Sequence, residues 1–294
     1  MSEADLKSYR GSCHCGAFVY EAKLPEIKAF SECNCSICHK LGYAWLFPGQ
    51  GGLDIVKGCI GDLTTYTFGK GKYIYRFCPD CGTAVLAEIP HRGPEMGIGI
   101  NARAIQNLDV WSLDIKPFDG KSLQPLYSPP VYKGPEPNVE IENGQTYHGS
   151  CHCGAVTLAV KLKKPLEAYD ISNDEERIVE CNCSICARGG YVWVYPPREA
   201  SVIEGREHLS YRVFNNNILR KPFCKYCGVH VSNELNPLTD EEVEGLSDEA
   251  KAWRGRISSV RPINLRALND FDCKVLKTRH VDGWNEIKPA YVNP

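Results

Sequence analysis

The chain has 294 residues, of which 43% are apolar, and its 34 lysines and arginines against 36 aspartates and glutamates give a formal net charge of -2. This length accommodates one large domain or two ordinary ones, and the balanced charge argues against the basic surface typical of nucleic-acid binding. No apolar run reaches membrane-spanning length, and the polar N-terminus lacks the apolar segment of a secretory signal. We therefore expect a cytoplasmic protein with no membrane or nucleic-acid partner.

In chain order, short strands rich in aromatic and β-branched residues dominate the prediction. In the first half they fall at Phe18–Lys23, Tyr43–Phe47, Leu63–Phe68, Tyr73–Phe77, Thr83–Ile89 and Gly97–Asn101. In the second half they fall at Val156–Leu162, Tyr191–Tyr195, Leu209–Phe214, Val229–Leu235 and Ile257–Val260. The fold class expected from this pattern is mainly β.

Four motifs occur twice in the same order, which indicates a tandem duplication. They are GSCHCGA (11–17 and 149–155), ECNCSIC (32–38 and 180–186), FC-x-x-CG (77–82 and 223–228) and IN-x-RA (100–104 and 263–267). The proline-rich segment 126–146 lies between the copies and predicts a stiff, extended connection. We place the domain boundary within it, giving a first domain over 1–138 and a second over 139–294.

The spacing between motifs increases twice in the second copy, so insertions are expected there. One falls before Cys181, in the acidic stretch Ser172–Glu180, and the other falls between Cys227 and Ile263. The latter contains 238–253, which predicts a helix capped by Thr239. A surface excursion is favoured for this helix over a lid that covers a site.

Sixteen cysteines are more than chance would place in a chain expected to be cytoplasmic, where tight cysteine clusters more often bind metal than form disulfides. Each copy carries seven in the repeated motifs, and seven divide naturally into four and three. Structural zinc takes four protein ligands, whereas catalytic zinc keeps one position open. The closed sites are assigned to Cys13, Cys15, Cys78 and Cys81, and to Cys151, Cys153, Cys224 and Cys227.

The remaining three cysteines of each copy are assigned to open, catalytic sites: Cys33, Cys35 and Cys38, and Cys181, Cys183 and Cys186. Zinc with three thiolates has a net charge of -1, which suits it to holding a further thiolate more than to generating hydroxide. Up to four zinc ions per chain are expected. Two alternatives remain: the three-cysteine clusters bind no metal, or a nearby side chain closes them (His14, His39 or Glu32; His152 or Glu180). Cys59 and Cys273 lie outside the pattern and are expected to be small apolar fillers.

GSCHCGA, CNCSIC, FCPDCGT and the late IN-x-R segment resemble the glutathione-dependent formaldehyde-activating enzyme family, also called the CENP-V/GFA family. The resemblance spans nearly the whole chain, twice, and implies two β-tent domains in tandem, each supported by a four-cysteine zinc. It also implies condensation of formaldehyde with glutathione, with the substrate sulfur in the open position of the three-cysteine zinc. The first copy matches better, because the second lacks one basic residue after its CNCSIC motif and the threonine after its C-x-x-C motif.

Several polar and aromatic residues flank the clusters and are candidates for substrate binding. Lys40 and Arg188 could pair with a substrate carboxylate, or be ordinary solvated charges. Tyr43 with Trp45, and Tyr191 with Trp193, could wall a pocket or belong to the core. Arg76 and Lys221 could screen the thiolate clusters. Asn101 and Arg103, with Asn264 and Arg266, could orient a ligand or close a turn.

The function expected is therefore that of a zinc-dependent carbon–sulfur lyase or synthase acting on a glutathione-like thiol adduct of a small aldehyde or imine. One alternative is a relative that has diverged to another electrophile in specialised metabolism. The other is a non-catalytic zinc-binding or structural protein. It ranks lower, because it predicts a basic surface and the balanced charge argues against one. The oligomeric state is left open.

Overall fold

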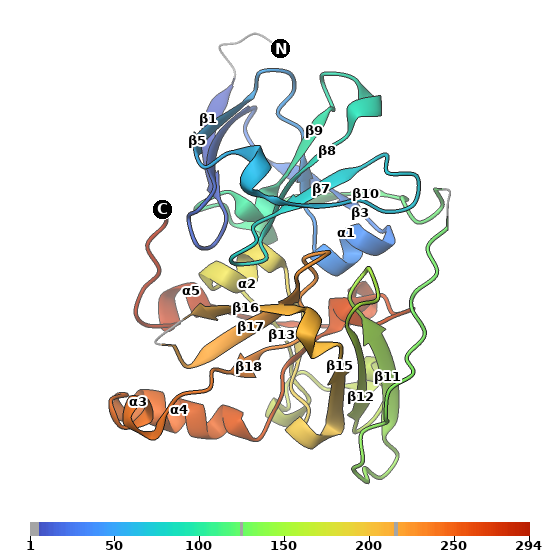
Figure 1. Cartoon of the computed structure of the whole chain (residues 1–294), viewed down its shortest axis with the longest axis vertical. Coiled ribbons are helices and arrows are strands. Elements are labelled where there is room, and N and C mark those ends of the chain that lie inside the picture. The colour runs from blue at the N-terminus through green and yellow to red at the C-terminus, as the bar shows by residue number, and fades with distance from the viewer. Residues whose placement is uncertain (1–5, 124–125, 215–216) are drawn as a thin grey trace.

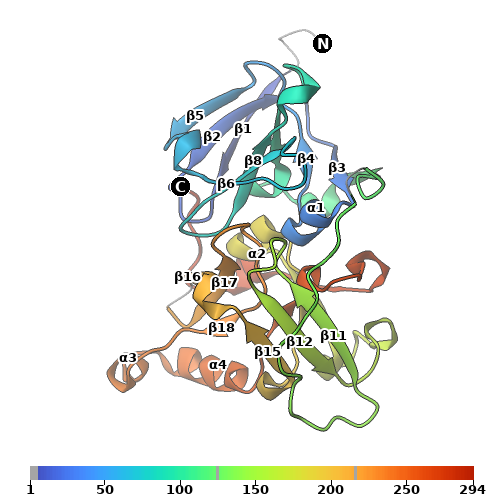
Figure 2. The same cartoon turned by 45° about the vertical axis from the view of Figure 1, so that its right-hand side comes forward.

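Two copies of one mainly β unit follow each other along the long axis of the molecule (Figure 1). The structure is a computed structural model, and it describes residues 6–123, 126–214 and 217–294. In Figures 1 and 2 the first copy runs from blue to green and the second from green to red, with α1 and α2 close to the boundary between them. Residues 126–144, which join the copies, contain neither helix nor strand. The exact position of the domain boundary stays a prediction.

The described part of the first copy contains two sheets and one short α-helix. An antiparallel sheet has the order β1-β2-β5: β1 (Lys7–Ser12), β2 (Val19–Leu24) and β5 (Leu53–Lys57). A second sheet has the order β10-β3-β4-β9-β8-β7-β6: β10 (Asp114–Phe118), β3 (Ala29–Cys33), β4 (Trp45–Leu46), β9 (Ile98–Asn101), β8 (Ala84–Glu88), β7 (Ile74–Phe77) and β6 (Thr64–Tyr66). Strands β10 and β3 pair in parallel, and α1 (Ser36–Leu41) follows β3 directly.

The second copy repeats this arrangement with its larger sheet split in two. Its first sheet has the order β11 (Gln145–Ser150), β12 (Thr157–Leu162) and β15 (Ser201–Glu204). The second has the order β19 (Ile263–Asn264), β14 (Trp193–Val194), β13 (Ile178–Cys181) and β20 (Arg279–Val281). The third has the order β16 (Leu209–Phe214), β17 (Leu219–Cys224) and β18 (Glu234–Leu235). Where β8 pairs with β9 in the first copy, only the isolated bridge Ser232↔Ile263 joins the corresponding segments. The insertion that contains α3 and α4 lies between these two segments in sequence.

Short helices complete both copies. The α-helices of the second copy are α2 (Ser184–Gly189), α3 (Asp240–Glu244), α4 (Asp248–Ser258) and α5 (Gly283–Glu286). The 3-10 helices are η2 (Ile60–Asp62), η3 (Pro90–Arg92), η4 (Ala102–Ala104), η5 (Val110–Ser112), η6 (Leu166–Ala168), η7 (Asp174–Glu176), η8 (Arg198–Ala200), η9 (Arg206–His208), η10 (Leu265–Ala267) and η11 (Cys273–Val275). Two of them, η4 and η10, follow directly on the strands of the repeated IN-x-RA motif.

The mainly β fold and the tandem repeat are confirmed, and ten of the eleven expected strands overlap an observed strand, often in shortened form. The strand expected at Ile257–Val260 is wrong: Ile257 and Ser258 continue α4, and Val260 forms only an isolated bridge. The single helix expected over 238–253 is two helices, α3 and α4. Thr239 caps α3 with a reciprocal capping box, as expected. Helix α4 packs through Trp253 and Ile257 against Ile218 and Leu219.

One of the apolar clusters spans the two copies. A single cluster of buried side chains includes Ile37 of α1 together with Val192 and Leu265 of the second copy. Two glycines allow the helices to approach: Gly42 and Gly190 end α1 and α2 in the left-handed conformation, with φ of 62° and 55°. A Cβ on Gly42 would lie 2.7 Å from the carbonyl oxygen of Gly189, so this approach requires glycine.

Aromatic contacts near the chain end of each copy reinforce this interface. Tyr127 stacks on His152 of the second copy, with ring centroids 4.3 Å apart. Tyr291 stacks in turn on His14 of the first copy at 4.9 Å, and its hydroxyl donates to the backbone oxygen of the same histidine. Each copy thus reaches over the other's C-x-C loop.

Candidate metal centres and the cavity beside them

Each copy holds a group of four cysteines and a group of three that could bind a metal ion. Within each group the sulfur atoms all lie within 4.8 Å of one another. In the four-cysteine groups, neighbouring sulfurs such as those of Cys13 and Cys15, or of Cys153 and Cys224, lie 3.5 to 3.6 Å apart. A tetrahedron with Zn–S bonds of about 2.3 Å has edges of about 3.8 Å, so both the spacing and the soft donor set fit zinc.

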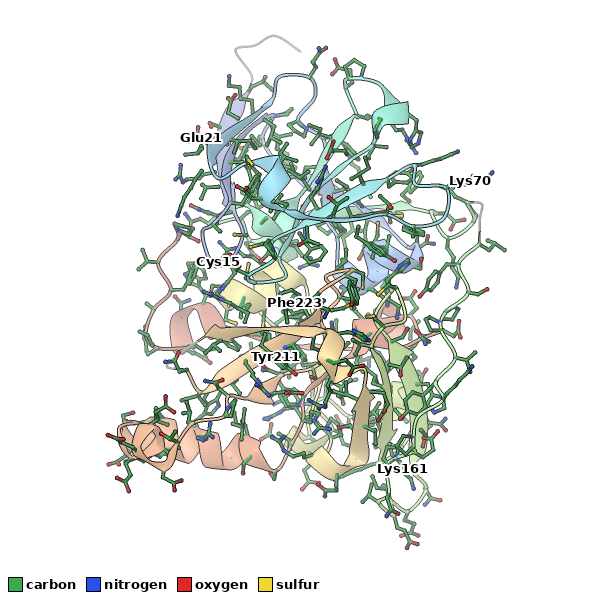
Figure 3. The ribbon with its side chains drawn as sticks, viewed as in Figure 1. Cys15, Glu21, Lys70, Lys161, Tyr211 and Phe223 are labelled. Carbon is green, nitrogen blue, oxygen red and sulfur yellow. The ribbon has the colours of Figure 1, made fainter. Side chains whose placement is uncertain are left out.

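The four-cysteine groups tie separate parts of each copy together. Cys13 and Cys15 follow β1, whereas Cys78 and Cys81 form the turn after β7. Figure 3 places Cys15 close to the boundary between the copies. A metal ion bound here would join the three-stranded sheet to the seven-stranded one.

The three-cysteine group of the first copy is built on the junction between β3 and α1. Cys33 ends β3, Cys35 is the N-cap of α1, and Cys38 lies one turn further along, on the same face as Cys35. The thiols of Cys35 and Cys38 hydrogen-bond to Cys33 and lower its pKa, so this cluster favours a thiolate. Cys181, Cys183 and Cys186 repeat the arrangement on β13 and α2.

A repeated Asp-Gly pair supports each three-cysteine cluster, and the motif comparison missed it. Asp119 accepts a hydrogen bond from Asn34 at 2.8 Å, and Asp282 accepts one from Asn182 at 2.9 Å. The glycine that follows packs directly on the first sulfur of the cluster. The signal was present in the sequence, because DG at 119 and 282 has the same separation as the IN-x-RA motifs.

We expect Gly120→Ala to weaken metal binding at the first three-cysteine cluster alone. A Cβ at this position would lie 2.3 Å from the sulfur of Cys33, so either the loop or the ligand must move. Peptide-resolved alkylation in the presence of a chelator should show earlier loss of protection at 33–38. Gly255→Ala is the matched control, since a Cβ there meets nothing within 4 Å. Equal protection in both variants would contradict the expectation.

A cavity of about 680 Å³ opens on the first three-cysteine cluster. Its lining includes all three cysteines of that cluster and, among the described residues, none of the second cluster. Trp45, Phe47, Phe68 and Tyr75 provide aromatic walls from the first copy. The second copy contributes the segment 268–272, so this cavity lies between the copies. None of the residues of α3 or α4 lines it, and the surface-excursion interpretation of that insertion stays a prediction.

Lys40 and Arg188, assigned to substrate binding, lie buried between the copies. The ammonium of Lys40 donates to the backbone oxygens of Ser150 and Ala267 and to Oδ1 of Asn269, each at 3.0 Å. Arg188 donates to the backbone oxygen of Ser12 at 3.1 Å, across the interface in the opposite direction. Neither is a solvated charge. Although Lys40 lines the cavity, its substrate role stays a prediction, since hydrogen bonds to the second copy already engage its ammonium.

None of the side chains considered as a fourth ligand joins a cysteine group in the described part of the chain. His14 and His152 point across the interface, where their Nε2 atoms lie 3.2 and 2.9 Å from the hydroxyls of Ser184 and Ser36. Burial lowers the pKa of both histidines to about 3, so they are neutral. The others are engaged elsewhere or stay outside the groups: Glu32 pairs with Lys274, Glu180 accepts from Thr278, and His39 lines the cavity.

The aromatic pair Tyr43 and Trp45 serves both of the roles considered for it. The two rings stack with centroids 4.2 Å apart. Tyr43 belongs to the core, whereas Trp45 lines the cavity and donates a hydrogen bond from Nε1 to the sulfur of Cys38 at 3.3 Å. Their assignment to substrate binding stays a prediction.

The repeated Asn and Arg residues close turns. Asn101 caps η4 by accepting from the backbone of Arg103, and Asn264 caps η10 by accepting from Arg266. Arg76 pairs with Glu88 at 2.7 Å instead of screening a cluster. Of the two cysteines outside the pattern, Cys273 is buried as expected, but Cys59 is exposed, so its assignment as an apolar filler is wrong.

Comparison with known families identifies both copies. The model of the glutathione-dependent formaldehyde-activating enzyme family matches residues 8–116 and again residues 146–254. The protein belongs to this family, as a tandem duplication. A crystal structure of a Rhodobacter sphaeroides protein is similar over 46% of this chain and 99% of its own length, with 18% identity and a TM-score of 0.31. Within the described residues, no helix of this family member has the length and apolar character needed to cross a bilayer.

Proposed function

We propose that the protein is a zinc-dependent carbon–sulfur lyase or synthase that works at the first three-cysteine cluster. The observation that carries this proposal is the cavity that opens on Cys33, Cys35 and Cys38. A three-cysteine group beside a cavity has room for one further sulfur, whereas the four-cysteine groups already have a complete ligand set. The substrate would be a thiol, glutathione or a similar molecule, together with a small aldehyde or imine.

The reaction balances without an external oxidant or reductant. Zinc bound by the three thiolates would keep the incoming substrate sulfur in its thiolate form. A carbon–sulfur bond forms between that sulfur and the electrophilic carbon, and the π bond of the carbonyl or imine breaks. The proton released by the thiol goes to the oxygen or nitrogen of the product.

Two aromatic residues place hydrogen-bond donors at this point of the cavity. The hydroxyl of Tyr75 lies 3.8 Å from the sulfur of Cys38. Burial, and then the charge of Cys38, raise the pKa of Tyr75, so its hydroxyl stays neutral and can donate a hydrogen bond to the heteroatom of the electrophile. Trp45 holds Cys38 through its own hydrogen bond, and both side chains thus orient the reacting groups.

The lining also favours an electrophile larger than formaldehyde. Phe47, Phe68, Tyr73, Phe118 and Phe271 give the cavity an apolar, aromatic wall, which suits an aromatic electrophile better than a one-carbon aldehyde. Binding sites of this size and character usually accommodate drug-sized ligands. A relative that joins a thiol to an aromatic aldehyde or imine is therefore the second candidate function.

Titration of the cobalt-substituted protein with glutathione tests the proposal. A sulfur that enters the coordination sphere should increase the sulfur-to-cobalt charge-transfer absorption, at about one equivalent per chain. Cys35→Ser should abolish the change, because it removes a ligand of the open cluster. Unchanged spectra in the parent protein, with cobalt bound at the three-cysteine clusters, would exclude the thiolate-binding mechanism.

A further inference from the structure

The two three-cysteine clusters differ at one position that faces the metal ligands. Tyr75 on β7 and Lys221 on β17 both lie two residues before the phenylalanine of the FC-x-x-CG motif. Tyr75 lines the cavity. The side chain of Lys221 is only 1% exposed, and its ammonium has no hydrogen-bond partner within the described residues. A buried lysine without such a partner is costly unless another interaction offsets the loss of hydration.

Aromatic rings surround this ammonium in place of hydrogen-bond acceptors. Its nitrogen lies 4.2 Å from the ring centroid of Trp193, 5.0 Å from that of Tyr191 and 5.1 Å from that of Phe214. Such cation–π contacts stabilise a desolvated ammonium. They fix the ammonium beside the three-cysteine cluster, because Tyr191 and Trp193 pack against Cys183 and Cys186.

The cysteine cluster supplies the opposite charge once it holds a metal ion. Three thiolates with one divalent ion have a net charge of -1, which a single ammonium neutralises. In the first copy the hydroxyl of Tyr75 occupies the corresponding position, so this position contributes no counter-charge there.

Apolar side chains then cover the second cluster. Phe214, Val281 and Ile287 pack against its buried residues. Gly283 of α5 approaches Cys181 as Gly120 approaches Cys33, but a Cβ on Gly283 would also lie 3.1 Å from Cδ1 of Ile287, so Ile287 at the end of α5 lies beside the cluster.

We propose that the second three-cysteine cluster is a sealed structural metal site, in which Lys221 is the built-in counter-cation, and that only the first cluster is open to substrate. This division of roles rests on the proposed function for its account of the first cluster. The duplication has thus kept one open site and converted the other into a fixed element of the fold. The second copy contributes instead to the cavity at the first three-cysteine cluster, through the segment 268–272.

Alkylation of the zinc-loaded parent protein with iodoacetamide tests the sealing directly. Peptide mass spectrometry resolves the two clusters, and we expect 33–38 to react at least about tenfold faster than 181–186, because alkylation follows the access to a thiolate. Equal rates, or a faster second cluster, would overturn the proposal. This experiment requires no thiol substrate, so its result is independent of whether glutathione binds.

The role of Lys221 is tested with Lys221→Met, which removes the charge and keeps a long apolar side chain. The chelator concentration that exposes 181–186 to alkylation should fall by about ten- to a hundredfold, as for other partners that support metal ligands. Lys225→Met is the control, because this exposed lysine lies in the adjacent C-x-x-C loop. Unchanged protection in Lys221→Met would overturn the counter-cation role. A failed glutathione titration, with these results intact, would overturn the proposed function alone.

Discussion

Replacing Cys78 with serine should unfold the first copy. The change removes one of four ligands, and structural zinc sites contribute about 10–16 kcal/mol of apparent binding free energy, as much as the whole stability of a typical domain. Cys78 and Cys81 would no longer be linked to Cys13 and Cys15, and the two sheets of the copy would lose their connection. Circular dichroism and metal analysis should show loss of β structure together with loss of metal.

The shared core extends this expectation to the second copy. Because Ile37 and Leu41 pack in the same cluster as Val192 and Leu265, loss of the first copy exposes apolar surface on the second. We expect the parent protein to unfold in one transition. In Cys78→Ser we expect both copies to lose much of their stability. Cys59→Ser is the control: this cysteine is exposed and outside the clusters, so its replacement should change stability by less than about 0.5 kcal/mol. A parent-like melting curve for Cys78→Ser would refute a structural role for this site.

The cysteine partition could be predicted because the sequence encodes it locally. A C-x-C-x-x-C segment can place three sulfurs on one strand–helix junction, and Cys35 and Cys38 lie one helical turn apart for that reason. The C-x-C and C-x-x-C pairs lie far apart in sequence, but counting ligands was enough to join them. The strands followed from alternation and turn residues, and the repeat allowed each assignment to be checked in the other copy.

Helix α4 shows where local pattern is insufficient. Ile257 to Val260 resembles a strand by composition, yet Ile257 continues the helix because it packs with Trp253 against Leu219. Tertiary packing overrides the preference of a short β-branched segment. The Asp-Gly pairs were missed for a different reason. They do recur in the sequence, but a two-residue motif becomes informative only when the structure shows its glycine in contact with Cys33 or Cys181.

The contacts that Lys40 and Arg188 make between the copies could not be predicted, because they join residues more than a hundred positions apart. Lys40 and Arg188 follow the cysteine clusters in sequence, which suggested contact with a substrate. Each instead crosses to a serine of the other copy, Ser150 or Ser12, and these two serines are themselves equivalent in the repeat. Comparison of the two copies aligns Lys40 with Arg188 and Ser12 with Ser150. It does not show that each basic residue contacts the serine of the other copy.

Lys40→Met should therefore destabilise the protein more than it affects substrate affinity. Its ammonium donates to the backbone oxygens of Ser150, Ala267 and Leu268 and to Oδ1 of Asn269, all in the second copy. Methionine keeps the apolar stem but leaves these buried acceptors without a donor, at a cost of about 3 kcal/mol or more. The melting temperature should fall by roughly 6–12 °C.

Lys121→Met separates this structural role from substrate binding. Lys121 also lines the cavity but is exposed, so its replacement should leave the melting temperature unchanged. If Lys40 held a substrate carboxylate, Lys40→Met would raise KM for glutathione at an unchanged melting temperature. If it joins the copies, the loss of stability should recur in Arg188→Met, whose guanidinium crosses the same interface in the other direction. Thermal denaturation and KM measured on all three variants decide between the two roles. Only an interface role predicts that Lys40→Met and Arg188→Met both lower the melting temperature.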